Sequence, residues 1–198
     1  MRAVRTYPTK RLVDVGVAAL GLLVCLPGLL TVGGILALVS GESPLFVQPR
    51  VGWHERVFSL YKLRTLQFKA TGVRRRWLTR AGLLLRTYSV DELPQLWNVL
   101  RGDMSLVGPR PLLVEYLPHY SAEQRKRHAV RPGITGWAQV HGRNALPWPE
   151  RFALDAWYVE HVSFQLDVKI ARLTLRQVLS PRHVRPEGLS EEEKFRGE

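Results

Sequence analysis

The feature that most constrains this chain is a long apolar stretch near its N-terminus. No residue from Val15 to Gly41 is charged. As an α-helix, about 20 apolar residues cross the hydrocarbon core of a bilayer, which is ~30 Å thick. The stretch is longer than the apolar region of a usual signal peptide, and no A-x-A-like cleavage site closes it. The sequence therefore predicts a membrane segment, with a cleaved signal peptide as the less favoured alternative.

Two features indicate how this segment lies in the membrane. Pro27 and Gly28 stand near its middle, where proline removes a helical hydrogen bond and clashes with the preceding turn, at a cost of ~3 kcal/mol. Each half is then too short to cross alone. Basic residues flank both ends, and the positive-inside rule places such flanks on the cytoplasmic face: Arg2, Arg5, Lys10 and Arg11 before the stretch, and Arg50, Arg56, Lys62 and Arg64 after it.

A helix, a break at Pro27 and a second helix that leaves on the side of entry satisfies both observations. The sequence thus predicts a re-entrant membrane hairpin. The alternative is a kinked helix that spans the bilayer, because proline is tolerated in membrane helices.

The composition limits what the remainder can be. The 198 residues carry a net charge of +12, and 45% of them are hydrophobic, which is enough for one buried core. The single cysteine, Cys25, excludes an internal disulfide framework and a cysteine-based zinc site. A basic chain could bind nucleic acid, but no nucleic-acid motif is present and much of the basic excess lies beside the membrane segment. We therefore expect no nucleic-acid partner.

The residues after the membrane segment predict a small α+β domain that is mostly helical. β-Branched and aromatic residues surround a turn at 51–54, which predicts a short hairpin within 44–65. Helices are expected after residue 92, from about residue 150, and from Asp167, where apolar residues follow helical spacing with basic residues opposite. The last of these is either an ordinary core helix or an amphipathic helix on a membrane surface. We expect domains at 1–41, 42–180 and 181–198, the last a charged tail.

A run of one charge sign leads to an acidic pair. Residues 57–90 contain no carboxylate, and Asp91 and Glu92 then follow side by side. The run holds eight basic side chains: Lys62, Arg64, Lys69, Arg74, Arg75, Arg76, Arg80 and Arg86. Such a pattern favours a polyanionic ligand, because guanidinium groups grip phosphates and Mg²⁺ can bridge carboxylates to phosphate oxygens.

The acidic pair is also expected at the N-terminus of a helix. Ser89 to Glu92 fits a capping box, and Asp91 as the N-cap would put Pro94 at the third helical position. Caps alone would explain both carboxylates; a carboxylate nucleophile is the functional alternative. Other catalytic patterns are not supported, since the sequence has no i,i+4 histidine pair, G-x-S-x-G, Walker loop or G-x-G-x-x-G.

Long blocks of this sequence resemble the monotopic polyprenol-phosphate phosphoglycosyl transferases, a family of bacterial sugar transferases. The resemblance covers about Lys10 to Leu179, as expected of the minimal catalytic form. Its blocks are KRLVDV at 10–15, YKLRT at 61–65, DELPQLWNVLRGDMSLVGPRP at 91–111, RPGITGWAQVHGRN at 131–144 and DAWYVEHVSFQLDVKI at 155–170.

This resemblance implies transfer of a phosphosugar from a UDP-sugar to polyprenol (undecaprenyl) phosphate, with release of UMP, at the start of glycoconjugate or exopolysaccharide synthesis. It implies catalysis by Asp91 and Glu92 with Mg²⁺, which would be bound at Asp91. Asp91 would form a covalent phosphosugar intermediate. Substrate contacts carried over by motif are Lys62, Arg64, Arg86, Arg110 and Arg143, with Arg86 toward the lipid phosphate.

The same resemblance implies a re-entrant helix broken at Pro27, lipid contact at the bacterial inner membrane, and a catalytic domain on the cytoplasmic face. A homodimer is left open, and the sequence does not identify the sugar. Departures from the family pattern stand at Leu26, at 67–70 and at His141. The alternative functions are a membrane-anchored basic binding module and a membrane phosphoesterase.

Overall fold

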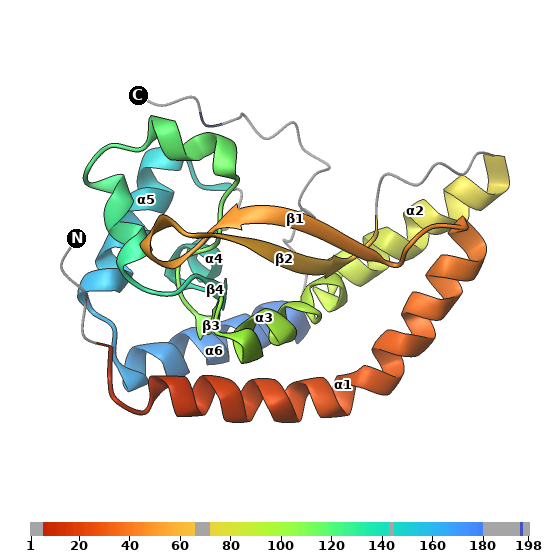
Figure 1. Ribbon diagram of the computed structural model, residues 1–198, viewed down its shortest axis with the longest axis horizontal. Coiled ribbons are helices and arrows are strands. Elements are labelled where there is room, and N and C mark those ends of the chain that lie inside the picture. Colours follow the sequence, from red (N-terminus) through yellow and green to blue (C-terminus); the bar gives the residue numbers. More distant parts are fainter. Residues whose placement is uncertain (1–5, 66–71, 143–144, 180–194, 196–198) are drawn as a thin grey trace.

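The computed structural model describes residues 6–65, 72–142, 145–179 and 195. The described part is a mostly helical α+β fold, as the sequence predicts (Figure 1), and it contains two small sheets. Its elements in chain order are α1 (Lys10–Ser40), β1 (Leu45–Val51), η1 (Trp53–Glu55), β2 (Val57–Leu63), α2 (Gly72–Thr87), η2 (Val90–Glu92), α3 (Gln95–Arg101), β3 (Ser105–Val107), η3 (Val114–His119), η4 (Gln124–Ala129), β4 (Gly133–Thr135), α4 (Trp137–His141), α5 (Trp148–Glu160) and α6 (Phe164–Leu179), where η marks a 3₁₀ helix.

The apolar stretch forms one long helix, α1, which contains Pro27. Within the described residues it is the one helix long and apolar enough to cross a membrane, by length and composition alone. Figure 1 shows that α1 bends part-way along its length. Proline lacks the N–H that would bond to the preceding turn, which makes a bend of this kind understandable. The helix is continuous through Pro27 rather than divided into two, so re-entry stays a prediction.

The start of α1 is bound to α6 through a buried ion pair. Lys10 pairs with Asp167 of α6, and both side chains are 8% exposed. The ammonium group of Lys10 also donates to the carbonyl oxygen of Val107 at 3.1 Å. Tyr7 and Tyr158 each donate a hydroxyl hydrogen bond to Asp167, at 2.9 and 2.8 Å. Burial, reinforced by the Asp167 carboxylate, raises the pKa of Tyr158, which keeps its hydroxyl a donor.

Two further charged residues of α1 bind main-chain groups of the domain. The Arg11 guanidinium donates to the carbonyl oxygens of Val99 and Leu100, at 2.6 and 3.0 Å. The Asp14 carboxylate accepts from the N–H of Leu106 at 3.0 Å. The charged residues that precede the apolar stretch therefore act as anchors between α1 and the elements α3, β3 and α6.

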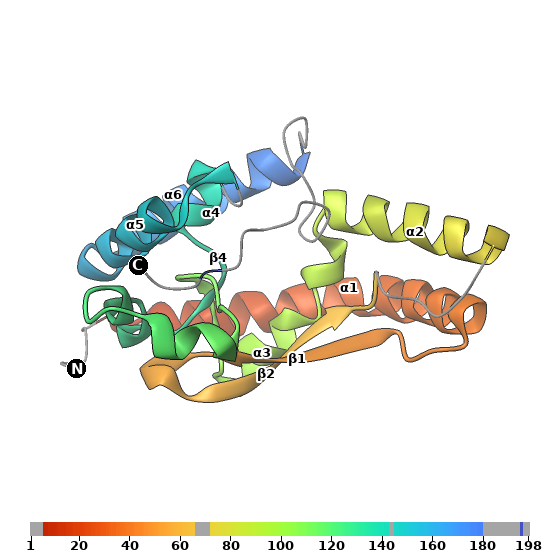
Figure 2. The same cartoon turned by 90° about the horizontal axis from the view of Figure 1, so that it is seen from above.

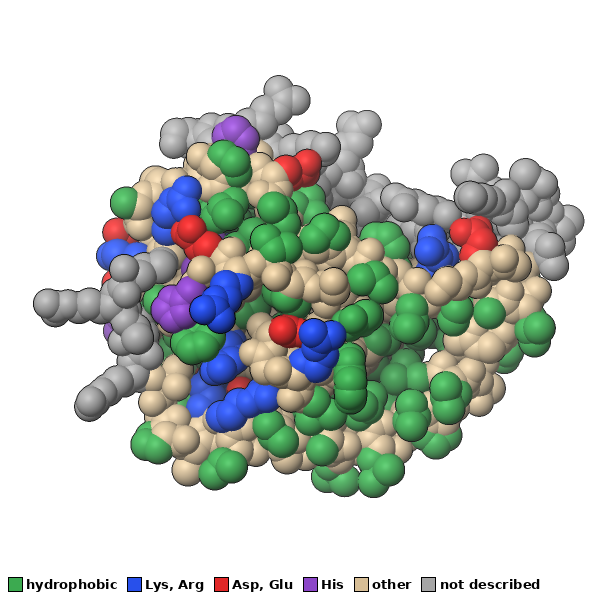
Figure 3. Space-filling model, in the orientation of Figure 1, with side chains coloured by type: hydrophobic (Ala, Val, Ile, Leu, Met, Phe, Trp, Pro, Cys, Tyr) green, Lys and Arg blue, Asp and Glu red, His purple; other side chains and the backbone are tan. Residues whose placement is uncertain are grey.

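Most of the apolar surface of α1 faces outward. Leu23 is 72% exposed and Leu38 is 81% exposed, while Ala18 is fully buried in a core cluster with Leu96 and Val99 of α3. Hydrophobic side chains line the lower rim of the molecule, which α1 forms (Figure 3). Figure 2 shows α4, α5 and α6 on one side of α1 and the β1–β2 hairpin on the other. A helix that packs along a narrow stripe leaves a broad apolar face for lipid.

The predicted hairpin is confirmed as β1 and β2. They pair antiparallel from Leu45↔Leu63 to Val51↔Val57, and η1 makes the turn between them, with His54 and Glu55 at positive φ. The sequence did not predict the second sheet, in which β3 and β4 pair in parallel. Each of its strands has three residues and borders a Gly/Pro-rich segment, so neither carries a strand pattern of its own.

The C-terminal helices begin slightly before their predicted starts. Pro147 is the N-cap of α5 and Pro149 lies in its first turn, where the missing proline N–H has no helical partner to lose.

Phe195 packs with Tyr116, Tyr120 and Phe152 in an aromatic cluster. The domain division at 41 and 180 stays a prediction.

We predict that Asp167→Asn strongly destabilises the protein. The substitution leaves the ammonium group of Lys10 buried without its counter-charge, which costs about 3–5 kcal/mol. Thermal unfolding in detergent micelles measures the change in Tm. The control is Glu123→Gln, whose partner Lys126 lies in an exposed pair with side chains 45% and 66% exposed, and we expect little change there. Equal shifts in the two variants would contradict the anchoring role.

Candidate active site

The acidic pair lies in the short turn between α2 and α3. Asp91 and Glu92 belong to η2, and Asp91 is 5% exposed. Ser89 adopts φ 56°, in the left-handed region that non-glycine residues rarely occupy. Strain of this kind persists where the surroundings hold it, and here it turns the chain from α2 into η2. The dyad thus stands on a backbone bend rather than on a regular helix.

The structure corrects the expected capping arrangement. Helix α3 begins at Gln95 with Pro94 as its N-cap, so Asp91 is not the cap and Pro94 is not at the third helical position. Ser89, for its part, makes no capping hydrogen bond through its side chain among the described residues. The physical reason is that Pro94 has no N–H. It cannot continue the i→i−3 hydrogen bonds that Glu92 and Leu93 donate in η2, so this 3₁₀ turn stays separate from α3.

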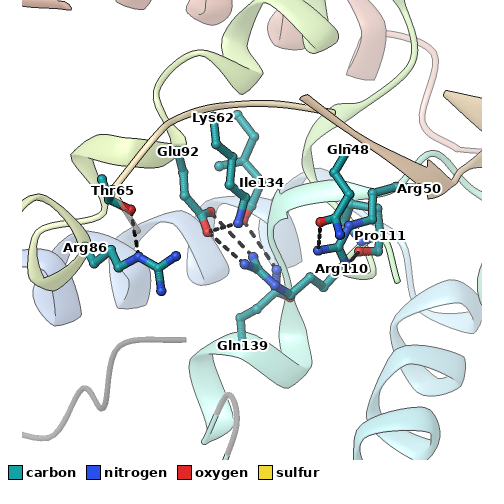
Figure 4. Close-up of polar contacts among 10 residues, drawn as sticks. All are labelled: Gln48, Arg50, Lys62, Thr65, Arg86, Glu92, Arg110, Pro111, Ile134 and Gln139. Carbon is teal, nitrogen blue, oxygen red and sulfur yellow. Dashed lines mark hydrogen bonds and ion pairs between the residues drawn. The ribbon is translucent and has the colours of Figure 1, made fainter. Parts of the chain in front are cut away.

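Glu92 forms ion pairs with two cations from different parts of the chain. Lys62 of β2 places its Nζ 3.0 Å from Oε1 of Glu92, and Arg110 places its Nη2 2.7 Å from the same oxygen. Figure 4 shows the two cations converging on this carboxylate. The three side chains are only 14–23% exposed, so the contacts are less screened than surface pairs. The structure therefore brings Lys62, Glu92 and Arg110 together.

Three glycines allow Arg110 to reach this place. A Cβ on Gly108 would lie 2.3 Å from the carbonyl oxygen of Arg131, and one on Gly133 would lie 2.1 Å from the nitrogen of Gly108. At Gly136 the distance to the oxygen of Gly108 would be 2.2 Å. Two glycine-rich blocks thus pack backbone against backbone, which only glycine permits. The N–H of Gly108 donates to Thr135 at 2.9 Å across this contact.

The acidic pair lines a cavity of about 580 Å³. Asp91, Glu92, Arg86 and Arg110 contribute to its polar part. The apolar part includes Ala171, Leu175 and Val178 of α6 and Val17 of α1. The apolar helix α1 therefore contributes to the cavity lining through Val17, and a ligand with a charged head and an apolar tail would match both parts.

The other predicted site residues differ in their placement. Arg86 lines the cavity, and its Nε donates to Oγ1 of Thr65 at 2.8 Å (Figure 4). Arg64 points elsewhere: its Nε donates to the oxygen of Ser43 at 2.9 Å, and a guanidinium nitrogen lies 3.8 Å from Glu42. Arg143 lies outside the described residues, as do the departures at 67–70.

Sequence reasoning missed a buried ion pair in the cavity wall. Arg127 of η4 and Asp155 of α5 both line the cavity, 2.8 Å apart, with side chains 3% and 5% exposed. Burial raises the pKa of the Asp155 carboxyl to about 6, although the Arg127 guanidinium acts in the opposite direction. A signal was present in the sequence: Asp155 shares the buried face of α5 with Phe152 and Val159, at spacings of three and four residues.

The donor groups fit Mg²⁺ only if a ligand contributes. Within the described residues, no group of three or more His, Cys, Asp or Glu side chains could hold a metal ion. Mg²⁺, however, is usually bound through one or two carboxylates together with substrate phosphates and water. Asp91 and Glu92 both line the cavity, and Glu92 is engaged by Lys62 and Arg110.

Comparisons with known proteins identify the family of the chain. A family model described as bacterial sugar transferase matches residues 5–181. An uncharacterized sugar transferase, EpsL of Bacillus subtilis (strain 168), is 46% identical, and the match covers 95% of this chain and 96% of that protein. The UDP-glucose:undecaprenyl-phosphate glucose-1-phosphate transferase of Caulobacter vibrioides is 41% identical, with 86% of this chain and 70% of that protein covered.

A third relative is longer than this chain. The UDP-N-acetylgalactosamine-undecaprenyl-phosphate N-acetylgalactosaminephosphotransferase of Aeromonas hydrophila is 38% identical over 186 residues. The match covers 86% of this chain but 44% of that protein. The chain therefore spans nearly the whole of one relative and less than half of another.

We predict that Gly133→Ala disrupts the contact that positions Arg110. The new Cβ would meet backbone atoms of Gly108 and Thr135 at 2.1–2.7 Å, and overpacking of this kind costs about 1–3 kcal/mol. A lower Tm in thermal unfolding is the expected result. Gly34→Ala is the matched control, because nothing lies within 4 Å of a Cβ there. A Gly133→Ala protein as stable as the Gly34→Ala protein would contradict the close approach.

Proposed function

The chain belongs to the bacterial sugar transferase family, and we propose that it transfers a phosphosugar from a UDP-sugar to polyprenol phosphate. It is an enzyme of the phosphoglycosyl transferase type, since relatives are named undecaprenyl-phosphate sugar phosphotransferases. One observation carries the proposal. An acidic pair, of which Asp91 is buried, shares a cavity with adjacent cations and with apolar residues that include one from α1.

The cavity suits two substrates of different solubility. The cationic groups Arg86 and Arg110 can bind phosphate oxygens, because guanidinium groups form bidentate bonds with them. The apolar residues of α6 and Val17 of α1 can contact an isoprenoid chain. A soluble sugar nucleotide and a lipid phosphate could therefore both reach the same carboxylates.

In the first step, a carboxylate oxygen of Asp91 attacks the β-phosphorus of the UDP-sugar. A bond forms between that oxygen and phosphorus, and the bond from phosphorus to the bridging oxygen breaks. UMP leaves with the bridging oxygen, and the phosphosugar stays on Asp91 as an acyl phosphate. Arg110 and Lys62 stabilise negative charge on the phosphoryl oxygens, which is the main catalytic task in phosphoryl transfer.

In the second step, a phosphate oxygen of polyprenol phosphate attacks the same phosphorus. The bond to Asp91 breaks, the free carboxylate returns, and a polyprenyl-diphosphate sugar is released. Arg86 lies in the cavity wall, where it can hold the lipid phosphate for this attack. Bound Mg²⁺ would supply further neutralisation of phosphate charge, with Asp91 as its protein ligand.

Glu92 has a distinct task in this scheme. Its carboxylate holds the ammonium of Lys62 and the guanidinium of Arg110 through ion pairs. We expect Glu92 to orient these cations toward the phosphates, so that they need no reorganisation when charge develops.

We further propose that α1 re-enters the inner membrane and leaves on the cytoplasmic side. Both ends of α1 belong to one body: Lys10 pairs with Asp167 of α6, and the far end continues into β1 after residue 44. A helix that crossed the bilayer would separate its two ends by ~30 Å of hydrocarbon. The contact at the start of α1 and the direct continuation of its end into β1 place both ends beside the same domain, which favours re-entry over spanning.

We predict a covalent intermediate on Asp91. Purified protein mixed with a panel of UDP-sugars, without lipid, should release about one equivalent of UMP per enzyme, as a two-step mechanism requires. Mass spectrometry of the trapped protein should locate the phosphosugar on Asp91. Asp91→Asn should abolish both the burst and the label, because it removes the nucleophilic oxygen and keeps the shape.

The matched control is Asp103→Asn at the end of α3. Asp103 pairs with Arg101 at 3.4 Å, and its substitution should leave the burst intact. A label on Glu92, or a wild-type rate in Asp91→Asn, would refute the mechanism. Continuous UMP release without lipid would instead identify a phosphoesterase that uses water as the acceptor.

The topology is tested by cysteine labelling in intact cells. In a Cys25→Ser background, Thr6→Cys places a thiol before α1 and Ser59→Cys places one after it, both at exposed positions. Re-entry predicts that an impermeant reagent labels neither thiol before lysis and both after lysis. Labelling of one thiol alone in intact cells would mean that α1 spans the membrane.

A further inference from the structure

Arg127 makes contacts that reach beyond its ion partner. Its Nη2 lies 2.8 Å from Oδ2 of Asp155 and donates to the main-chain carbonyl oxygen of Arg110 at 2.6 Å. Its Nη1 lies 3.4 Å from the hydroxyl oxygen of Tyr120, and its guanidinium carbon lies 5.4 Å from the ring centre of Phe152. The buried guanidinium of Arg127 therefore connects α5 to Arg110, the residue that forms an ion pair with Glu92.

Stability alone is a poor explanation for this pair. Two charges that leave water lose several kcal/mol of solvation each, and hydrophobic replacements of buried ion pairs are often as stable or more stable. Asp155 also has an oxygen, Oδ1, without a hydrogen-bond partner in the described part of the protein. A geometric role is the better-founded alternative, because buried ion pairs can specify one arrangement of the chain.

The segment that carries Arg110 needs such a constraint. It follows β3 as an irregular chain between Gly108 and Pro111. The N–H of Gly133 donates to the oxygen of Pro109 at 3.0 Å, and Arg50 donates to the oxygen of Pro111 at 3.3 Å. Arg127 supplies the bond to Arg110 itself. The peptide from which the Arg110 side chain extends is thus held by a buried, charged donor.

We propose that Arg127 and Asp155 are positioning residues, which hold the main chain at Arg110 and so place its guanidinium against Glu92 and the donor phosphates. Asp155 neutralises and orients Arg127, Arg127 holds the carbonyl of Arg110, and Arg110 contacts Glu92. Neither member of the pair needs to touch the reacting atoms. This inference rests on the proposed function of Arg110 at the dyad.

A double-mutant cycle separates positioning from a general effect on folding. We measure kcat and KM for transfer from the radiolabelled UDP-sugar that the wild type uses, in detergent with polyprenol phosphate. Arg127→Lys keeps a charge but replaces the planar guanidinium, whose Nη2 contacts Asp155 and Arg110 and whose Nη1 contacts Tyr120, with a single ammonium group that lacks this fixed geometry. It should reduce kcat/KM by about tenfold or more in the wild-type background, within the range of couplings between groups in one network.

In the Arg110→Ala background the same change should have almost no effect, because the residue that it positions is gone. Asp155→Asn is the second variant. It keeps the size of the side chain and removes its charge, and it should show the same loss and the same coupling. It replaces Arg127→Lys if that protein does not fold.

Arg125→Lys is the matched control. Arg125 lies in the same 3₁₀ helix and likewise binds a carboxylate and a carbonyl: Glu55 at 2.7 Å and Leu117 at 2.9 Å. Neither Glu55 nor Leu117 lines the cavity, so Arg125→Lys should have the same small effect in both backgrounds.

Equal fold-losses for Arg127→Lys in the presence and absence of the Arg110 side chain would overturn the inference, as would an Arg110→Ala protein with unchanged kinetics. Both outcomes are independent of the aspartyl intermediate, which the labelling of Asp91 tests separately.

Discussion

The buried ion pair between Lys10 and Asp167 is the contact on which the rest of this structure depends. It joins the first described helix to the last one, across almost the whole length of the chain. Because α6 and the start of α1 are fixed to each other, Val17 and the apolar residues of α6 face the same cavity. Together with the main-chain contacts of Arg11 and Asp14, this ion pair holds the apolar helix against the domain, and the helix contributes Val17 to the lining of the site.

Local sequence patterns predicted the helices and strands whose residues carry an apolar period or a turn signal of their own. The hairpin at 45–63, the helix α1 and the helices α5 and α6 each follow from apolar periodicity or from turn residues, and the structure contains them. The parallel pairing of β3 with β4 could not be predicted this way, because three-residue strands between glycines and prolines carry no period. The prediction that Asp91 caps the helix was wrong for a related reason. Pro94 sets the start of α3, and it acts through the backbone rather than through a side-chain pattern.

In the candidate site, too, residues with a local sequence signal were predicted and residues whose role depends on tertiary contacts were not. The acidic pair and the cations Lys62, Arg86 and Arg110 were visible as a pattern of charge and as family motifs, and the structure places all of them near one another. The Arg127–Asp155 pair was not predicted, because in the sequence both are ordinary charged residues. Their importance arises from burial and from a main-chain contact to Arg110. Burial of a charge is a tertiary property, so the only local signal was a carboxylate on the apolar face of α5.

Function at this site requires precise charge placement from elements that are distant in sequence. Glu92 comes from η2, its cations come from β2 and from the segment after β3, and the support for that segment comes from η4 and α5. A cation on a flexible surface would have to reorganise as negative charge develops, whereas a cation already held in place does not. Two contacts hold the same short segment: the close backbone approach of Gly108 and Gly133, and the hydrogen bond from Arg127 to the carbonyl oxygen of Arg110. The fold thus uses a close backbone approach and a buried charge for one purpose, the fixed position of one guanidinium group.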